Sequence, residues 1–529
     1  MRLTALLLFT LSIFSAFAQR QNGLVQDNYG GYATLQHNPA NLADSRFKFN
    51  MNVLGLNAHV QNNFIQMEAP HSMYKFFQLS LDSNFGKQDL NYPFEKIYMK
   101  ERLNGKNKFA YASASASVLS MQFALKDKAG FSIGFTTKAY GSLNKFSENG
   151  IKTFLQDLDT IGPNKENQER LLGESMDMSK AGVAALAYQQ ISFKYARVVK
   201  DKKHDFIKIG LGLDYNIGLY GSYFSTKEAA FDLVGIDTLN ITNSGIEFAY
   251  LNEDYLSSPT RRLNDYFGKS RLGRGLGVNL GFVYEYRENS RDFKYKMDRK
   301  THEDHSVNKY TWKVAASLTD VGFVNFNKAG VARKVTINPE TTPLNWNDFD
   351  EADSWSSFKE VDSFATSFFS NVDTASKFTM FTPAALHLAA DYKLMNNLYV
   401  AANYSQNLIR NNGRGVKTPN VLTVTPRYER KWFTAALPIS ASRFYNIVNV
   451  GAYIRAGLFY IGSDNLGGLF TAKKTNGFNI YTGFNWPIHH KRLIDSDGDE
   501  VSDNFDKCPD YVGSKYTEGC PDEDGDKVR

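Results

Sequence analysis

Five aspartates near the C-terminus have the residue type and spacing of a loop that wraps a metal ion. Counted from Asp495, they occupy relative positions 1, 3, 5, 9 and 12, as Asp495, Asp497, Asp499, Asp503 and Asp506. Calcium takes six to eight hard oxygen ligands, and Gly498 permits the sharp turn that brings such ligands together. We therefore predict that these carboxylates bind Ca²⁺. A merely acidic, solvated linker is the alternative interpretation.

A second acidic unit begins at Cys520 and is incomplete where the sequence reaches Arg529. It contains Asp522, Asp524 and Asp526, and we predict that these carboxylates also bind calcium. Cys508 and Cys520 are the only cysteines of the 529 residues. In an oxidising compartment such as the periplasm we expect them to form a disulfide, and two free thiols are the alternative.

The cysteine and proline residues of these units carry a resemblance. The first unit resembles an EF-hand loop, but Asp506 stands where a glutamate is usual. Because Pro509 follows Cys508 and Pro521 follows Cys520, the tail instead resembles thrombospondin type 3 repeats, which fold around calcium with little hydrophobic core. In the proteins that this tail resembles, such repeats usually join a barrel to a periplasmic OmpA-like domain that binds peptidoglycan. The resemblance implies a peptidoglycan-binding region beyond Arg529.

The charge of the chain divides into two unlike parts. The whole sequence has a formal net charge of +6. Residues 495–529 contain 12 acidic and 4 basic residues, a net charge of −8, so residues 1–494 carry +14. A hydrophobic fraction of 42% excludes a disordered chain, and the overall charge gives no reason to expect nucleic acid as a partner. The basic body could attract anionic lipopolysaccharide, although dispersed loop and rim charge is the simpler interpretation.

The N-terminus has the organisation of an export signal. Met1 and Arg2 provide a positive start, Leu3 to Phe17 form a largely apolar run, and residues 16–18 have the small-x-small pattern of a signal peptidase site. We predict that residues 1–18 are a signal peptide. A membrane anchor helix is the alternative, but the run is shorter than the ~20 residues that span a bilayer.

The body of the chain alternates with the period of β-strands. Between residues 206 and 220, odd-numbered positions from Ile207 to Leu219 are apolar, and even-numbered positions from Lys208 to Gly218 are polar or glycine. This run is longer than the ~5–6 residues typical of globular strands and suits a tilted strand that crosses a membrane. Similar alternation recurs within 131–136, 276–286, 386–404 and 478–486.

The connections between these strands alternate in length. Short ones lie at 126–130, 200–205 and 395–397, and long ones at 61–107, 146–185, 223–273 and 326–382. Outer-membrane barrels have short periplasmic turns and long external loops. We therefore predict an all-β fold, a transmembrane antiparallel β-barrel of about 14 strands over residues 46–490, with a periplasmic C-terminus. Two strands, near 431–443 and 457–472, are weakly patterned. A soluble array of β-sandwiches is the alternative.

The segment before the first strand resembles the N-terminal signature of the FadL/PorV-like outer-membrane barrels. Residues 38–43, Asn-Pro-Ala-Asn-Leu-Ala, match the pattern that precedes the first strand in that family. Residues 455–466 are similar to a segment of uncharacterised Gram-negative relatives. The resemblance implies a barrel in the bacterial outer membrane, with residues 19–45 inside or beneath it as a plug and residues 491–529 as a periplasmic extension. Members range from transporters of hydrophobic solutes to partners of secretion and assembly machines.

No catalytic arrangement stands out, and we expect that the protein is not an enzyme. Residues 302–305, His-Glu-Asp-His, lack the spacing of a helical zinc site and are interpreted as a solvated turn. The first functional hypothesis is an anchoring or accessory subunit of an outer-membrane complex for secretion or barrel assembly, because the loops are large and no ring of pore-lining charge is evident. The second is a FadL-like transporter of hydrophobic solutes, which a plugged lumen and an apolar pocket under the loops would support.

Overall fold

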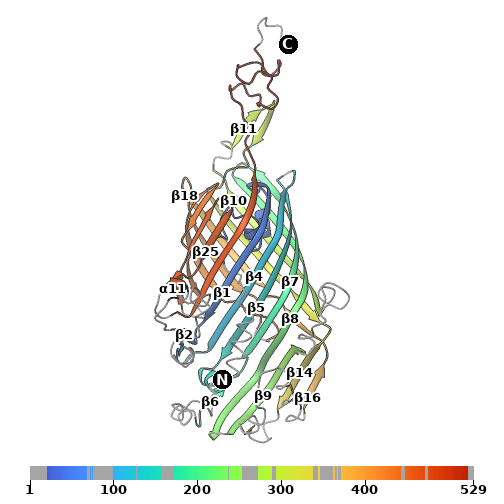
Figure 1. Ribbon diagram of the computed structural model, residues 1–529, viewed down its shortest axis with the longest axis vertical. Helices are drawn as coiled ribbons and strands as arrows, with labels where there is room; N and C mark the ends of the chain where they lie inside the picture. Colours follow the sequence, from blue (N-terminus) through green and yellow to red (C-terminus); the bar gives the residue numbers. More distant parts are fainter. Residues whose placement is uncertain are drawn as a thin grey trace, which may run out of the picture.

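The chain forms a closed β-barrel with a narrow extension at one end (Figure 1). The computed structural model describes residues 21–67, 72, 74, 99–126, 128–155, 172–235, 238–252, 272–288, 293–337, 344–345, 362–363, 366, 371–410, 413–442, 447–470 and 475–521. The predicted signal peptide, residues 1–18, lies outside the described residues. Within them, no helix has the length and apolar character needed to cross a membrane.

Fourteen antiparallel strands make up the wall, which confirms the predicted fold. Strands β1 and β26 pair from Phe47↔His489 to Gln61↔Gly477 and close the barrel. Two strands are interrupted and are written as pairs. In order, the wall consists of β1 (Phe47–Asn62), β4 (Lys108–Ala124), β5 (Gly130–Phe146), β7 (Gly182–Lys202), β8 (Asp205–Gly235), β10 (Gly273–Tyr286), β13 (Trp312–Phe326), β18 (Ala385–Met395), β19 (Leu398–Asn407), β20 (Val421–Arg430), β21 (Phe433–Ala436) with β22 (Ile439–Ser442), β23 (Ile447–Val450) with β24 (Ala452–Ala456), β25 (Phe459–Ser463) and β26 (Gly477–His489).

The interruptions coincide with residues that weaken a strand. Pro438, which has no N–H to donate, lies between β21 and β22. Gly451 lies between β23 and β24, and its N–H donates to the Pro438 carbonyl oxygen at 2.7 Å. The weak strand predicted near 457–472 is shorter than expected: β25 ends at Ser463 and a short helix, α11 (Leu466–Phe470), follows.

Side chains alternate between the outer surface and the lumen, as the sequence pattern predicts. On β8, Leu211 and Leu213 are 46% and 55% exposed, whereas Asp214 and Asn216 are buried. On β10, Leu276 is 60% exposed and Asn279 is buried. An apolar outer surface around a polar lumen is the arrangement of a barrel that crosses a bilayer. The protein is therefore a β-barrel of the outer-membrane type.

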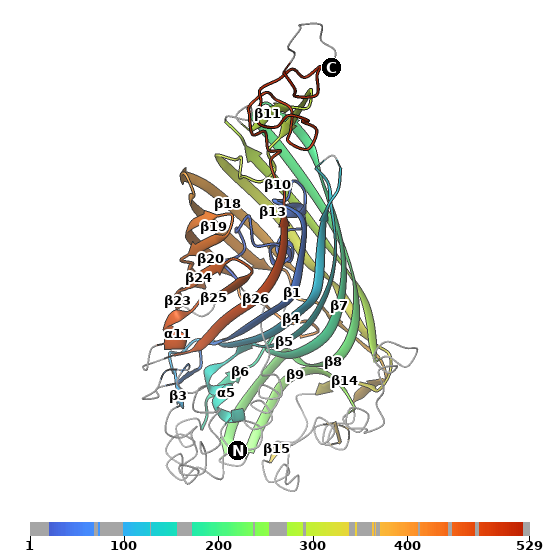
Figure 2. The same cartoon turned by 45° about the horizontal axis from the view of Figure 1, so that its top comes forward.

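The wall continues far at one end, which we name the loop end (Figure 2). There β8 pairs with β9 (Thr238–Leu251), and β9 pairs with β14 (Gly330–Ile337) and β15 (Leu344–Asn345). Parts of 223–273 and 326–382, which were predicted as loops, are thus strands. The prediction was wrong because the apolar–polar alternation stops in this part of β8. Both faces of the strand are polar there, as is possible outside the lipid bilayer, through the residues Ser225, Thr226, Lys227 and Glu228. Further short elements here are β2 (Ile65–Met67), β3 (Met99–Glu101), α5 (Glu148–Leu155), β6 (Ser175–Asp177), β16 (Val372–Ala375) and β17 (Phe378–Phe381).

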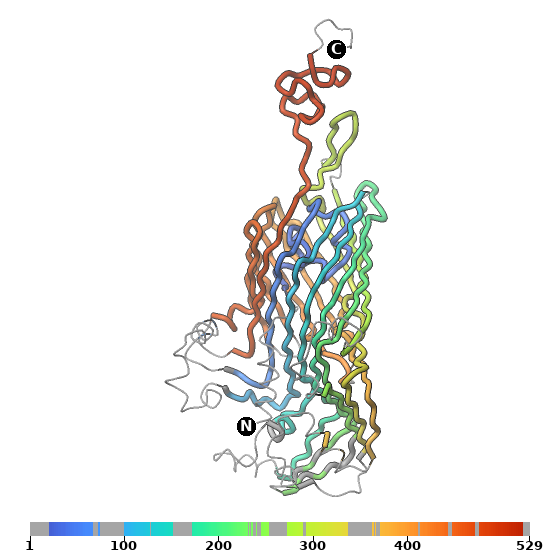
Figure 3. The backbone as a smooth tube through the Cα atoms, turned by 45° about the vertical axis from the view of Figure 1, so that its right-hand side comes forward, coloured from blue at the N-terminus to red at the C-terminus, as the bar shows by residue number. Residues whose placement is uncertain are grey.

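The opposite end, which we name the tail end, carries the short hairpin connections and the C-terminal segment. The connection between β10 and β13 departs from this pattern. It projects as a hairpin of β11 (Lys294–Met297) and β12 (Lys300–Glu303) beside the C-terminal segment (Figure 3). Residues 302–305, interpreted as a solvated turn, instead end this hairpin and return the chain to the barrel. Residues 293–311 are named the arm, and residues 490–521 the tail.

Candidate functional site

Residues 21–46, which we name the plug, lie inside the tail-end half of the barrel (Figure 3). The plug contains α2 (Tyr32–Leu35) and the 3₁₀ turn η1 (Pro39–Leu42). Its apolar side chains Leu24, Tyr32, Leu35 and Leu42 are at most 1% exposed. Asn38 starts η1, because its Oδ1 accepts a hydrogen bond from the backbone N–H of Ala40 at 2.9 Å and Pro39 is preorganised for the first position.

Glycines on the lumen face of the wall make room for the plug. A Cβ at Gly134 would lie 1.6 Å from the Tyr32 hydroxyl oxygen, and one at Gly281 would lie 2.2 Å from Asn38 Oδ1. Both distances are shorter than any side chain tolerates. At Gly134 and Gly281, therefore, the missing side chain is what allows the plug to lie against the wall.

Buried ion pairs hold the plug to the wall near both of its ends. Asp27 accepts hydrogen bonds from Arg455 Nε at 2.8 Å and from the Tyr453 hydroxyl at 2.8 Å. Asp44 pairs at 2.8 Å with Arg287, which follows β10, and within the plug it pairs with Arg46 at 2.9 Å. Removing one partner of such a pair leaves a buried, uncompensated charge, which costs about 3–5 kcal/mol. The plug is therefore a fixed part of the folded barrel.

A third cluster lies between these two. Arg427 is fully buried and pairs with Asp391 at 2.9 Å and with Glu429 at 2.8 Å. Glu429 in turn accepts hydrogen bonds from the backbone N–H and the side chain of Asn28 in the plug, at 3.1 and 2.8 Å. The plug thus completes a charge network that belongs mainly to the wall.

Charged side chains thus lie in the lumen as paired clusters, which the sequence analysis did not predict. The sequence motifs missed them because each charged residue stands alone on the polar face of its strand. Lys208 and Asp214, for example, interrupt the glycines of β8 and are both buried in the lumen. The clusters could have been predicted from charged residues at the lumen-facing positions of membrane strands.

Two chambers lie on either side of a constriction between the plug and the wall. The neutral chamber, of about 80 Å³, lies towards the loop end against β13, β18 and β19, and its lining contains no Asp, Glu, Lys or Arg. The charged chamber, of about 40 Å³, lies towards the tail end and is lined by residues such as Asp44, Lys208 and Glu285. Val25 and Gln26, together with Asn41, line both chambers. These three plug residues therefore lie between the two chambers and separate them, and we name them the constriction.

The neutral chamber has a mixed lining, in which apolar and polar groups occur together without a charged side chain. Gln26 closes one side of it by donating from Nε2 to Asn403 Oδ1 at 2.9 Å. The ring of His387 is held in the wall between Thr319 Oγ1 at 3.0 Å and Ser405 Oγ at 2.8 Å. Thr418 lines the loop-end side of the chamber, in a segment whose Lys417 N–H donates to Ser142 Oγ at 3.2 Å.

An apolar layer fills the lumen beyond the neutral chamber, towards the loop end. Its members are large buried side chains that share one contact cluster. They include Tyr111, Tyr140, Leu186, Tyr188, Tyr223, Phe326, Phe378 and Met380. The lumen therefore changes along its length from apolar, to mixed and uncharged, to charged.

The arm contacts the tail at its tip and the plug at its base. At the tip, Asp298 accepts hydrogen bonds from the backbone N–H of Ser502 at 2.8 Å and from its hydroxyl at 2.9 Å. At the base, His305 Nδ1 lies 2.9 Å from Asp44 Oδ1, and the Tyr29 hydroxyl donates to the Ser306 carbonyl oxygen at 2.9 Å. One connector therefore joins the tail to the plug.

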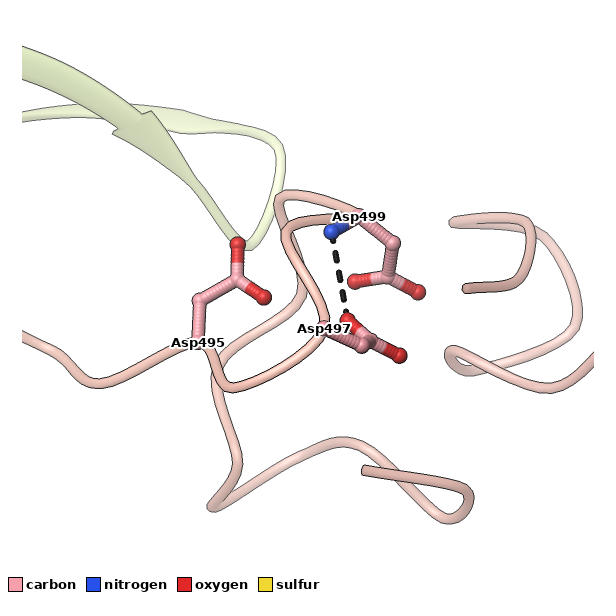
Figure 4. A group of neighbouring side chains, drawn as sticks. All are labelled: Asp495, Asp497 and Asp499. Atoms are coloured by element: carbon pink, nitrogen blue, oxygen red, sulfur yellow. Dashed lines mark hydrogen bonds between the residues drawn. The ribbon is translucent and has the colours of Figure 1, made fainter. Parts of the chain in front are cut away.

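Three of the predicted calcium ligands lie together in the tail (Figure 4). Oxygen atoms of Asp495, Asp497 and Asp499 lie within 4.8 Å of one another, and Gly498 has a φ of 86°, which a glycine adopts without strain. Burial and the negative charges of Asp499 and Asp506 raise the pKa of Asp497. Crowded carboxylates of this kind are the donor set that a hard divalent cation fits.

The other predicted ligands are placed differently. Asp503 accepts hydrogen bonds from the backbone N–H and hydroxyl of Ser496, both at 2.8 Å, and Asp506 accepts one from the backbone N–H of Cys508 at 2.7 Å. Cys508 and Cys520 are joined by a disulfide. The remaining predicted ligands, Asp522, Asp524 and Asp526, lie outside the described residues.

Comparisons with known proteins give one family and a distant likeness in fold. Among solved structures, the chain is similar to a monoaromatic hydrocarbon channel TodX mutant (12% identity, TM-score 0.38, covering 87% of this chain and 95% of that one). It is also similar to the Pseudomonas putida toluene transporter TodX (11% identity, TM-score 0.36, covering 89% and 96%). A third is the CymD monoaromatic hydrocarbon channel (10% identity, TM-score 0.34, covering 90% and 99%). At these values the likeness carries no argument about function.

The match to a family model is more extensive. No curated protein sequence matches the chain significantly. The model of a family of unknown function, DUF5723, matches residues 39–464, from η1 of the plug to the end of the β25 segment. That range includes the wall from β1 to β25 and the last eight residues of the plug. The chain therefore belongs to the DUF5723 family.

Proposed function

We propose that the protein is a plugged outer-membrane channel for small, largely hydrophobic solutes. The observation that carries this proposal is the plug itself, with a chamber on each side of a constriction made by Val25, Gln26 and Asn41. A solute from the loop end would have to displace side chains of the packed apolar layer before it reached the neutral chamber, and would then pass the constriction into the charged chamber. The plugged lumen and the apolar layer under the loops are the features that favour transport over anchoring.

The energies of the plug contacts favour a gate made of side chains. Moving the whole plug would break at least the two buried ion pairs Asp27–Arg455 and Asp44–Arg287, each costing about 3–5 kcal/mol when one partner is lost. Opening the constriction requires breaking the hydrogen bond between Gln26 and Asn403, which is worth about 0.5–1.5 kcal/mol. The smaller motion is the one that thermal fluctuation supplies readily. We therefore propose that the plug stays in place while Gln26 rotates.

Uptake by intact Gram-negative cells tests this proposal. The assay measures initial rates of uptake of radiolabelled methylcyclohexane and cyclohexanone with and without the protein. The double variant Gln26→Ala/Asn41→Ala widens the constriction and should raise the rate above that of the wild type, whereas Gln26→Trp should lower it. Equal uptake by cells with and without the protein would overturn the proposal.

Asn52→Ala is the matched control for these variants. Asn52 is a buried lumen residue that donates to Asn485 Oδ1 at 3.0 Å, and it lines neither chamber. It should leave uptake unchanged. If Asn52→Ala raised uptake as much as the double variant, a general loosening of the lumen would explain the result, and the constriction would not be the gate.

We also propose that the tail binds Ca²⁺ through Asp495, Asp497 and Asp499. The proximity of these carboxylates supports the proposal, together with the resemblance to thrombospondin type 3 repeats. A periplasmic tail that leads towards peptidoglycan would be anchored to the arm by the contacts of Asp298.

A second proposal is an anchoring role in an outer-membrane complex, with protein partners and lipopolysaccharide around it. Only that fixed position of the tail supports this role. Co-purification in mild detergent without any stable partner would count against it.

A further inference from the structure

Arg197 is a charged residue on the outer surface of the barrel wall. It belongs to β7, where the even-numbered residues from Ser192 to Ala196 are buried and face the lumen. The odd-numbered Phe193 and Tyr195 are 44% and 45% exposed on the outer surface, and Arg197 continues this outward series. A charged side chain on the lipid-facing side of a strand is tolerated near the edges of the bilayer and is costly at its centre. The depth of Arg197 in the membrane therefore decides its role.

The length of the outward apolar series places Arg197 at the tail-end edge of the bilayer. The opposite edge is marked by a polar pair on the outer surface, in which Thr137 Oγ1 of β5 donates to Gln189 Oε1 of β7 at 2.5 Å. Residues 189–197 make nine positions of β7, and a tilted strand crosses the hydrocarbon core in about 9–11 residues. The part of β7 between the two polar positions therefore meets acyl chains, and Arg197 meets the lipid headgroups of the tail-end leaflet.

The surroundings of Arg197 contain more positive than negative charge among the described residues. Lys128 of the turn between β4 and β5 pairs with Asp201 near the end of β7 at 2.5 Å, so this turn lies beside β7. Lys200 pairs with Asp205 at 2.6 Å, so both of these carboxylates are already neutralised. Asp127 lies outside the described residues. Four exposed cations at these two turns and on β7 form no ion pair with a described residue, and we name them the basic patch: Lys126, Arg197, Lys202 and Lys203.

We propose that the basic patch binds an anionic phospholipid of the tail-end leaflet, with Arg197 on its phosphodiester. A guanidinium carries its N–H donors in a planar fork that matches two phosphate oxygens at once. The three lysines attract the net negative charge of the headgroup, and each cation near the membrane surface raises the affinity about fivefold. The acyl chains lie against Phe193 and Tyr195. The site does not depend on the proposed channel activity, so either can fail while the other stands.

Titration of the full chain in a neutral detergent with single phospholipids, read by native mass spectrometry, tests the proposal. Phosphatidylglycerol and phosphatidylcholine share the phosphodiester, and only the first carries a net negative charge. Phosphatidylglycerol should bind more tightly than phosphatidylcholine. The Arg197→Leu substitution keeps an apolar outward side chain and removes the guanidinium, so it should weaken phosphatidylglycerol binding about fivefold. Retention of the compact, heat-modifiable electrophoretic form establishes that the variant folds.

Arg274→Leu is the matched control, because it removes the same charge from the other end of the wall. Arg274 is an exposed, outward residue at the loop end of β10, where Ile217 and Asn325 are its cross-strand neighbours. This variant should leave phosphatidylglycerol binding nearly unchanged. Equal losses in the two variants would mean that the lipid responds only to the total charge of the barrel, and the site would be overturned. Equal wild-type affinities for the two phospholipids would also overturn it, as would tighter binding of lipopolysaccharide than of phosphatidylglycerol.

Discussion

Breaking the ion pair between Asp27 and Arg455 should loosen the plug from the wall. The two residues are 428 positions apart in the sequence, and Asp27 Oδ2 lies 2.8 Å from Arg455 Nε. The Arg455→Met substitution keeps much of the apolar stem and removes the charge. It leaves the Asp27 carboxylate, whose side chain is 0% exposed, without a cation. The folded plug then carries a buried, uncompensated charge, whereas the open plug exposes that charge to water.

The expected magnitude follows from what Asp27 retains. Loss of one partner of a buried pair costs about 3–5 kcal/mol. Asp27 keeps its hydrogen bonds from the Tyr453 hydroxyl at 2.8 Å and from the backbone N–H of Tyr29 at 2.9 Å. We therefore expect the lower end of the range, about 3 kcal/mol. Because about 1.4 kcal/mol is a factor of ten, the open fraction of the plug should rise about a hundredfold.

Thiol labelling of a cysteine placed in the plug measures that fraction. Ala33 in α2 is 4% exposed, so Ala33→Cys is shielded while the plug is docked. The natural cysteines do not compete, because they form the disulfide of the tail. When reclosing is faster than labelling, the labelling rate is proportional to the open fraction. The rate should therefore rise about a hundredfold in Arg455→Met, with the barrel still compact in electrophoresis.

Two controls make the result decisive. Lys200→Met breaks an exposed pair with Asp205 at the tail end, and should change the rate less than about fivefold. Adding Asp27→Asn to Arg455→Met removes the stranded charge and should slow labelling again. Equal labelling rates with and without Arg455→Met would refute the reasoning, since the plug would then not depend on this pair.

Three further predictions concern the tail and its junction with the barrel. Calcium should protect the tail from proteolysis, and Asp495→Asn/Asp497→Asn should abolish the protection; equal cleavage in calcium and in chelator would contradict the metal site. Ser502→Ala should speed hydrogen exchange in the tail, because it removes a hydrogen bond to Asp298 worth about 1 kcal/mol; unchanged exchange would mean that the arm does not hold the tail. Burial, followed by nearby positive charge, lowers the pKa of His490 to about 4 from its ordinary 6.5. Between these values the unfolded state binds more protons, so acidification from about pH 6.5 to about pH 4 should lower the melting temperature, and this pH dependence should shrink in His490→Gln; an identical pH profile in the variant would assign the effect to other groups.

The alternation of residues along the chain was sufficient to predict the barrel. Successive side chains of a strand point to opposite faces, which is a local property of the chain. Leu211 therefore lies on the outer surface, whereas Asp214 points into the lumen. The number of strands followed from counting such runs and the connections between them. The same reasoning was wrong for the part of β8 beyond Ser225, since strands outside the bilayer need no apolar face.

The candidate site was decided only by the tertiary structure. The carboxylates of the tail could be recognised in the sequence because they lie within a few residues of one another. Asp27 and Arg455 show no such signal, since their partnership exists only after the barrel closes between β1 and β26 and the plug enters the lumen. The register of strands hundreds of residues apart places Asn403 opposite Gln26 and leaves the neutral chamber between them. Local patterns determine which face a residue occupies, whereas long-range packing determines what that face meets.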